Sequence, residues 1–76
     1  MDTKNEIVEL IAGVLEVPAS MIDEDTAIGD VDNWDSLRQL QIVAAIEGKY
    51  GFRFDPEVIM DLEDVSDIIA AVEERV

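Results

Sequence analysis

Ser36 has the side chain best placed for chemistry in this sequence, within the segment Asn33-Trp34-Asp35-Ser36-Leu37. A capping acid precedes the serine and an amphipathic run follows it, so Ser36 is predicted to begin a helix. A hydroxyl at a helix N-terminus lies among unpaired N–H groups and at the positive end of the helix dipole, where an attached phosphate is well accommodated. The chain has no histidine and no cysteine. This composition excludes Ser–His and Cys–His catalytic pairs and zinc sites built from these ligands.

The charge of the chain limits its partners. Nineteen acidic residues oppose five basic ones, which gives a formal net charge of −14. Such a surface repels nucleic acid and anionic membranes and attracts basic protein surfaces. The N-terminus has no basic stretch followed by an apolar one, and no apolar run approaches the ~18 residues of a membrane span. We therefore expect a cytoplasmic protein that binds neither nucleic acid nor membranes.

The acidic segments do not form a recognisable metal motif. A calcium-binding loop that began at Asp30 would need glycine at its sixth position and glutamate at its twelfth. The sequence has Asp35 and Gln41 there. No metal site is predicted, and weak binding of divalent cations by the acidic segments stays open.

Apolar residues at helical spacing predict an all-α fold, a small bundle of three main helices plus one short helix. The main helices are expected at about residues 3–16, at about residues 36–50 with Gly51 as the stop, and from near Asp64 onward. Asp55-Pro56-Glu57 begins the short helix. Residues between about 18 and 35 form a long first loop, and no strand pattern occurs. The length of 76 residues suits one small domain.

Two packing expectations follow from the spacing. The second helix is expected to have one apolar stripe with Ile46 beside it, made of Leu37, Leu40, Val43, Ala44 and Tyr50. The long loop is expected to be anchored to the core by Met21, Ile28 and Trp34. Trp34 has two interpretations, as a contact for a partner or as a lid over the core, because tryptophan is common in both settings.

With these elements in order, the chain resembles the acyl carrier proteins over nearly its whole length. The resemblance includes the acidity, the long first loop and Asp35-Ser36-Leu37 at the start of the second helix. Further along it includes Ile46-Glu47, Tyr50-Gly51-Phe52, Phe54-Asp55-Pro56 and Leu62-Glu63-Asp64-Val65-Ser66-Asp67-Ile68. Asp-Ser-Leu alone is a weak signal, whereas its place in this ordered set is specific.

The resemblance implies a monomeric carrier domain over residues 1–76 that is not an enzyme. A phosphopantetheinyl transferase would attach a 4′-phosphopantetheine arm, taken from coenzyme A, to Ser36. The thiol of the arm would hold acyl or aminoacyl groups as thioesters. Further implied partners are an acyl-loading ligase or transferase, and synthase or condensing enzymes.

The resemblance also suggests roles for neighbouring residues. Asp35 is placed to cap the helix or to contact the metal site of the transferase. Leu37 is expected to help partners recognise the helix, and Trp34 and Arg38 are further candidates for partner recognition. Val43, Ile46 and Leu62 are candidates for lining a space between helices where an acyl chain could lie.

Two departures from the family pattern bear on the pathway. Asn33 stands where glycine is common, and asparagine tolerates a left-handed backbone. Arg38 stands where an acid is common, so residues 35–50 are formally neutral, with Asp35 and Glu47 against Arg38 and Lys49. We expect a carrier in a polyketide, nonribosomal peptide or related pathway. The alternatives are a fatty-acid synthesis carrier, and an unmodified acidic helical adaptor that binds a basic protein.

Overall fold

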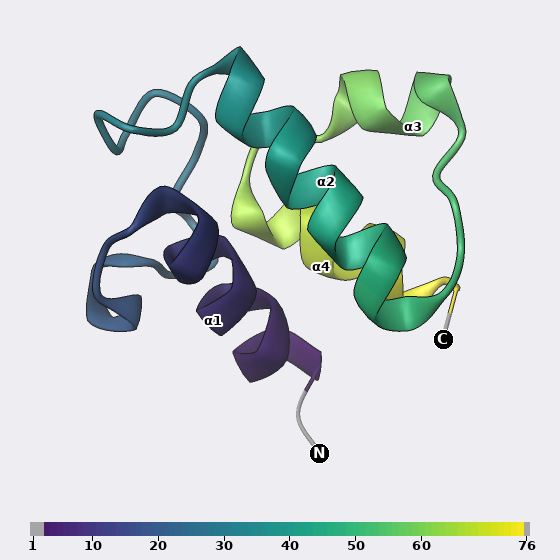
Figure 1. The fold of residues 1–76 in the computed structure, drawn as a ribbon, viewed down its shortest axis with the longest axis horizontal. Helices are drawn as coiled ribbons and strands as arrows, with labels where there is room; N and C mark the ends of the chain where they lie inside the picture. The colour runs from purple at the N-terminus through teal and green to yellow at the C-terminus, as the bar shows by residue number, and fades with distance from the viewer. Residues whose placement is uncertain (1–2, 76) are drawn as a thin grey trace.

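The structure is a computed structural model, and it describes residues 3–75. Its helices are α1 (Thr3–Leu15), α2 (Ser36–Tyr50), α3 (Pro56–Asp61) and α4 (Val65–Glu73), with a short 3-10 helix, η1 (Ala19–Met21), in the first loop. Figure 1 shows α1, α2 and α4 as the body of the bundle, with the short α3 at its edge. Residues 3–75 contain isolated bridges but no strand. The predicted all-α bundle of three main helices and one short helix is confirmed.

Capping residues set the boundaries of α2 and α4. The Asp35 carboxylate accepts a hydrogen bond from the backbone N–H of Arg38 at 2.9 Å, so Asp35 is the N-cap of α2. Gly51 ends α2 with a φ of 76°, a left-handed conformation that glycine adopts without steric cost. The Asp64 carboxylate caps α4 by accepting from the N–H of Asp67 at 2.8 Å. The Asp35 and Asp64 side chains satisfy N–H groups that would otherwise lack an intrahelical partner.

The core lies between α1, α2 and α4 and is mainly aliphatic. Its fully buried side chains are Ile7, Ile11 and Leu15 of α1, Ile42 and Ile46 of α2, Val65, Ile68 and Val72 of α4, and Trp34 of the loop. The short α3 contributes no buried residue. The three long helices therefore provide most of the hydrophobic stabilisation.

The long loop is held by hydrogen bonds to the junction between α3 and α4. The N–H of Ile28 donates to the carbonyl of Glu63 at 3.0 Å, and the N–H of Val65 donates to the carbonyl of Thr26 at 2.9 Å. The expectation that Met21 and Ile28 anchor the loop is wrong, because both side chains are exposed. Trp34 is buried as expected, and Ile22 is buried as well. Backbone hydrogen bonds at residues 26–28 leave the Ile28 side chain free to face solvent.

The predicted apolar stripe of α2 is correct for Val43 and the adjacent Ile46, and wrong for Leu37, Leu40 and Ala44. The residues of α2 that are buried are Gln39, Ile42, Val43 and Ile46. Leu37 and Leu40 are 64% and 57% exposed, and Ala44 is exposed as well. Two sets of residues in α2 have helical spacing, one with Leu37 and Leu40 and one with Gln39, Ile42 and Ile46. The second set is buried, because Ile42 and Ile46 pack into the shared core.

Candidate functional site

Ser36 is the first residue of α2 and its side chain is exposed. Within the described residues, the backbone N–H groups of Ser36 and Leu37 donate to no acceptor. Two free amides and the positive end of the α2 dipole therefore lie beside the Ser36 hydroxyl. This arrangement suits a phosphodiester on the serine oxygen.

Asp35 supplies the cap that begins α2 at Ser36. Its backbone is extended, with φ −112° and ψ −173°, and its carbonyl accepts the N–H of Gln39 at 2.9 Å. The carboxylate is exposed, so one of its oxygens caps the helix while the group remains open to solvent. Asp35 therefore caps α2, as expected. Its contact with the metal site of a transferase stays a prediction.

Asn33 and Arg38, on either side of Ser36, both contact the C-terminus of α1. The Asn33 side-chain amide donates to the carbonyl of Leu15 at 3.0 Å. The Arg38 guanidinium donates to the carbonyl of Val14 at 2.9 Å, and it lies 3.7 Å from the carboxylate of Glu16. Carbonyls at the end of a helix lack intrahelical partners, and a cation there interacts favourably with the dipole. Arg38 is therefore tied to α1, while its side chain keeps 33% of its surface exposed. Its role in partner recognition stays a prediction.

Asn33 does not adopt the left-handed backbone that asparagine tolerates. Among the described non-glycine residues only Glu16 has a positive φ, at 59°, and it lies just after α1. Asn33 acts through its side chain instead, by satisfying the last carbonyl of α1.

Trp34 belongs to the core and not to a contact surface, since only 1% of it is exposed. Its indole N–H donates to the Gln39 side-chain oxygen at 2.8 Å, and the Gln39 amide nitrogen donates to the carbonyl of Leu62 at 3.0 Å. We call this pair of hydrogen bonds the Gln39 bridge. It connects the loop before Ser36 with α2 and with the end of α3. Of the two interpretations of Trp34, the lid over the core is confirmed and the partner contact is wrong.

Leu37 lies on an uncharged face of α2. Residues three or four apart share one face of a helix, and here the exposed set is Leu37, Leu40, Gln41, Ala44 and Gly48. We call this set the outward face of α2. It contains no charged side chain, in a chain whose net charge is −14. It begins directly beside Ser36, which makes it available to any protein that reaches the serine.

The candidates for an acyl-lining role are packed in the core. Val43, Ile46 and Leu62 are all buried and belong to the same hydrophobic cluster. Leu62 also borders a shallow hollow between α3 and α4 with Val58 and Ala71. A role in contact with an acyl chain stays a prediction for these residues.

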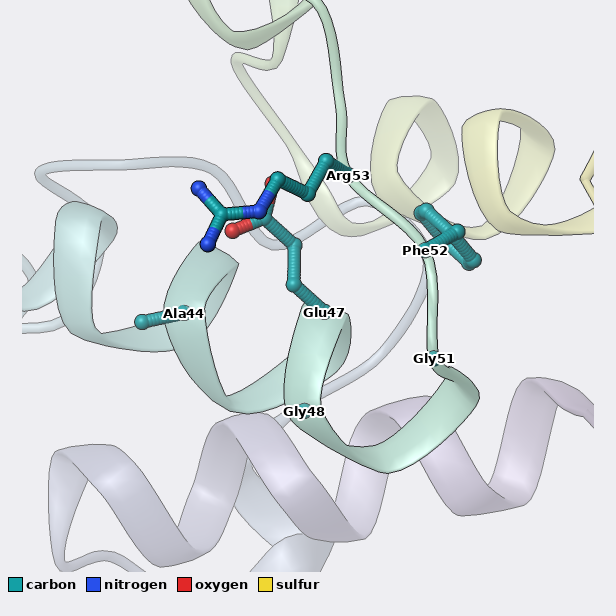
Figure 2. A pocket seen from close by; sticks show the side chains of 6 residues that line it. All are labelled: Ala44, Glu47, Gly48, Gly51, Phe52 and Arg53. Carbon is teal, nitrogen blue, oxygen red and sulfur yellow. The ribbon is translucent and has the colours of Figure 1, made fainter.

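A second hollow lies at the other end of α2 (Figure 2), lined by Ala44, Glu47, Gly48, Gly51, Phe52 and Arg53. The Glu47 carboxylate in it accepts a hydrogen bond from the backbone N–H of Phe54 at 2.8 Å. From Ser36 to Gly48 the helix rises by about 18 Å, at about 1.5 Å per residue. The hollow is therefore separate from the serine and shares none of its chemistry.

Residues 3–75 contain no group of three or more acidic, histidine or cysteine side chains placed to hold a metal ion. None of the helices in this described part is long and apolar enough to cross a membrane. The structure thus offers an exposed serine on a rigid helix start as its candidate site, with no internal base beside it.

Sequence reasoning missed Gln39 and did not single out the exposure of Leu40. Gln39 lies at helical spacing from Ile42, Val43 and Ile46, and a glutamine in such a stripe can be buried when its amide is fully hydrogen-bonded. The spacing therefore indicates that Gln39 could be buried. The hydrogen bonds to Trp34 and Leu62 show why burial is possible.

The chain is similar to known proteins over most of its length. The family described as "Phosphopantetheine attachment site" matches residues 5–72. An acyl carrier protein of Thermobifida fusca (strain YX) is 32% identical over 69 residues, which cover 91% of this chain and 84% of that protein. The solution structure of a holo acyl carrier protein from Geobacter metallireducens superposes with a TM-score of 0.85 at 23% identity, over 97% of this chain and 85% of that one.

Proposed function

The chain belongs to the acyl carrier protein family, and on that premise we propose that Ser36 is the residue that bears the arm. A member of this family is a carrier with covalently attached 4′-phosphopantetheine, and it is not an enzyme. Synthases, transferases and phosphopantetheinyl transferase are partners of the family in general. This family membership favours a modified carrier over the unmodified acidic adaptor.

The observation that supports Ser36 is its position at the capped start of α2. The serine is exposed, and the amides of Ser36 and Leu37 are unpaired. The other serines lack this combination. Ser20 lies in the short η1, and the amide of Ser66 is already donated to the carbonyl of Glu24 at 3.1 Å.

The reaction at Ser36 needs help from the transferase. The serine oxygen attacks the phosphorus of coenzyme A that bears the pantetheine, and the adenosine bisphosphate portion leaves. No histidine exists in the chain, and one oxygen of the Asp35 carboxylate already accepts the N–H of Arg38. The base that accepts the serine proton and the metal that balances the phosphate charge therefore come from the partner.

The outward face of α2 supports a specialised pathway over fatty-acid synthesis. The second helix of fatty-acid carriers is usually rich in acids that bind basic partners, whereas Leu37, Leu40 and Ala44 present no charge here. We infer that partners dock on this face by apolar contact, with Leu37 next to the reacting serine. Polyketide, nonribosomal peptide and related assembly systems suit such a carrier.

Intact mass measurement of the protein purified from its native cell tests the cargo and the pathway. We expect a mass increase for the arm at Ser36, together with a polyketide-type or aminoacyl thioester. A saturated long-chain acyl group as the main cargo would assign the carrier to fatty-acid synthesis instead.

A further inference from the structure

The Gln39 bridge lies on the route from Ser36 into the core. Ser36, Gln39, Val43 and Ile46 follow one another at spacings of three and four residues, so they occupy one side of α2. The Gln39 amide spans from this side of α2 to the carbonyl of Leu62, the C-cap residue of α3. A chain that left Ser36 and ran toward Val43 and Ile46 would meet the bridge first.

The chemistry of the bridge suits a glutamine amide. The indole N–H of Trp34 can only donate, and the backbone carbonyl of Leu62 can only accept. The residue between them must therefore offer one acceptor and one donor, as Gln39 does at 2.8 Å and 3.0 Å. Gln39 is 7% exposed and Trp34 is 1% exposed, so water has little access to either bond while the bridge is formed. Opening the bridge leaves buried polar groups unpaired, which is strongly unfavourable.

The core beyond the bridge is already filled. Val43, Ile46 and Leu62 are buried within one cluster, and every buried side-chain nitrogen and oxygen within residues 3–75 has a hydrogen-bond partner. An alkyl chain that entered there would have to separate packed side chains as well as break the bridge.

We propose that the Gln39 bridge keeps the cargo outside the helix bundle, so that this carrier is specific for short or polar acyl groups, including aminoacyl groups. The inference rests on the proposed attachment at Ser36, because it concerns groups carried on an arm at that residue. Gln39 and Trp34 are positioning residues in this account, since neither touches the reacting atoms. On this proposal Val43, Ile46 and Leu62 pack the core and contact no acyl chain while the bridge is closed.

A series of thioesters of increasing length tests the proposal. The apo protein is loaded with acetyl, butyryl, octanoyl or dodecanoyl arms from the corresponding acyl-coenzyme A by a broad-specificity transferase, and intact mass confirms each product. The melting temperature and the emission of Trp34, the single tryptophan of the chain, are then measured. For the wild type we expect both readouts to be the same for all four arms.

The matched variants are Gln39→Leu, which removes both hydrogen bonds at similar volume, and Gln41→Leu, a control on the outward face. Loaded Gln39→Leu protein is expected to melt at least about 4 °C higher with an octanoyl arm than with an acetyl arm, a shift large enough to report chain burial in a domain of this size. Trp34 emission should change in parallel. Gln41→Leu should behave as the wild type. If Gln39→Leu does not fold, Trp34→Phe removes one of the two bonds and is expected to show the same melting trend at smaller size.

Two results overturn the proposal. A wild-type melting temperature that rises with chain length would show that long chains enter the bundle despite the bridge. A flat response in the wild type together with flat responses in both bridge variants would show that something other than Gln39 keeps the cargo outside.

A failure of attachment is distinguished from a failure of the bridge. If no arm is added, the mass measurement contradicts the proposed function, and the bridge is tested on the unmodified protein with the neutral fluorescent probe N-phenyl-1-naphthylamine. We expect no enhancement of probe fluorescence by the wild type and clear enhancement by Gln39→Leu. Enhancement by the wild type, or none by Gln39→Leu, would overturn the inference.

Discussion

The Arg38 guanidinium donates a hydrogen bond to the backbone carbonyl of Val14 at 2.9 Å, and this contact joins the first turn of α2 to the last turn of α1. It places the cation at the negative end of the α1 dipole. Because α1 and α2 are far apart in sequence at these points, the contact helps to fix where Ser36 lies relative to the bundle. The same geometry explains why a basic residue occurs near the serine in a chain that is otherwise strongly acidic.

Replacing Arg38 with alanine should reduce stability and leave attachment intact. We expect a loss of about 1 kcal/mol in the free energy of unfolding, since the Val14 carbonyl loses a charged donor at a partly exposed site. Urea denaturation measures this loss. The transferase kcat/KM of the variant should remain within about twofold of the wild type, equivalent to about 0.4 kcal/mol. Lys49→Ala is the control, because it removes the same charge from the other end of α2. There Lys49 lies over the ring of its neighbour Tyr50. Unchanged stability with a large fall in kcat/KM would contradict the structural role and support partner recognition by Arg38.

Replacing Glu16 with glycine should stabilise the protein. Glu16 has a φ of 59° at the end of α1, a conformation that costs free energy for a residue with a Cβ atom. We expect a gain of up to about 1 kcal/mol, partly offset by the greater freedom of glycine in the unfolded chain. Glu16→Ala removes the same charge, including the 3.7 Å contact with Arg38, and keeps the Cβ atom. Equal melting temperatures for the two variants would argue against strain at this position.

The hydrogen bond between Trp34 and Gln39 should show energetic coupling. Trp34→Phe leaves the Gln39 side-chain oxygen unpaired, and Gln39→Leu leaves both the Trp34 N–H and the Leu62 carbonyl unpaired. Each unpaired group is expected to cost about 1–3 kcal/mol. The double variant should cost less than the sum, by about 0.5–3 kcal/mol, because the two residues share one bond. Urea denaturation of the four proteins gives the coupling, with Gln41→Leu as an exposed-glutamine control. Strict additivity would be inconsistent with the bridge as described.

Tyr50 should give the protein a pH-dependent loss of stability in alkaline solution. Burial, followed by its hydrogen bond to Glu6 at 3.0 Å and the charge of Glu6, raises the pKa of Tyr50 from 10.0 to about 12. The folded protein holds the phenol proton more tightly than the unfolded chain, so this contribution is present below pH 10 and is lost as the pH rises toward 12. Denaturation at pH 8, 10 and 11 should show a smaller decline for Tyr50→Phe than for the wild type. Parallel declines would contradict the assignment.

Local signals in the sequence were sufficient for the helix boundaries. Asp35 and Gly51 mark the two ends of α2, and Asp64 marks the start of α4, because capping depends on residues close in sequence. Local signals could not predict which face of α2 is buried. Leu37 and Leu40 compete with Ile42 and Ile46 for burial, and the choice depends on α1 and on the distant partners of Gln39.

The site was predicted to a similar extent. Ser36, its cap and its exposed position follow from the local pattern. The contacts of Arg38 and Trp34 could not be predicted, because their partners are Val14, 24 residues away, and a buried glutamine amide. Long-range contacts of this kind leave no periodic signal along the chain.

The central claim is that Ser36 bears the phosphopantetheine arm, and intact mass spectrometry tests it most directly. Wild type, Ser36→Ala and Ser66→Ala proteins are incubated with coenzyme A, magnesium and a broad-specificity transferase. We predict that the wild type and Ser66→Ala each gain the mass of one arm and that Ser36→Ala gains none. An arm on Ser36→Ala, or a wild type that stays unmodified while a known carrier in the same mixture is converted, would contradict the account.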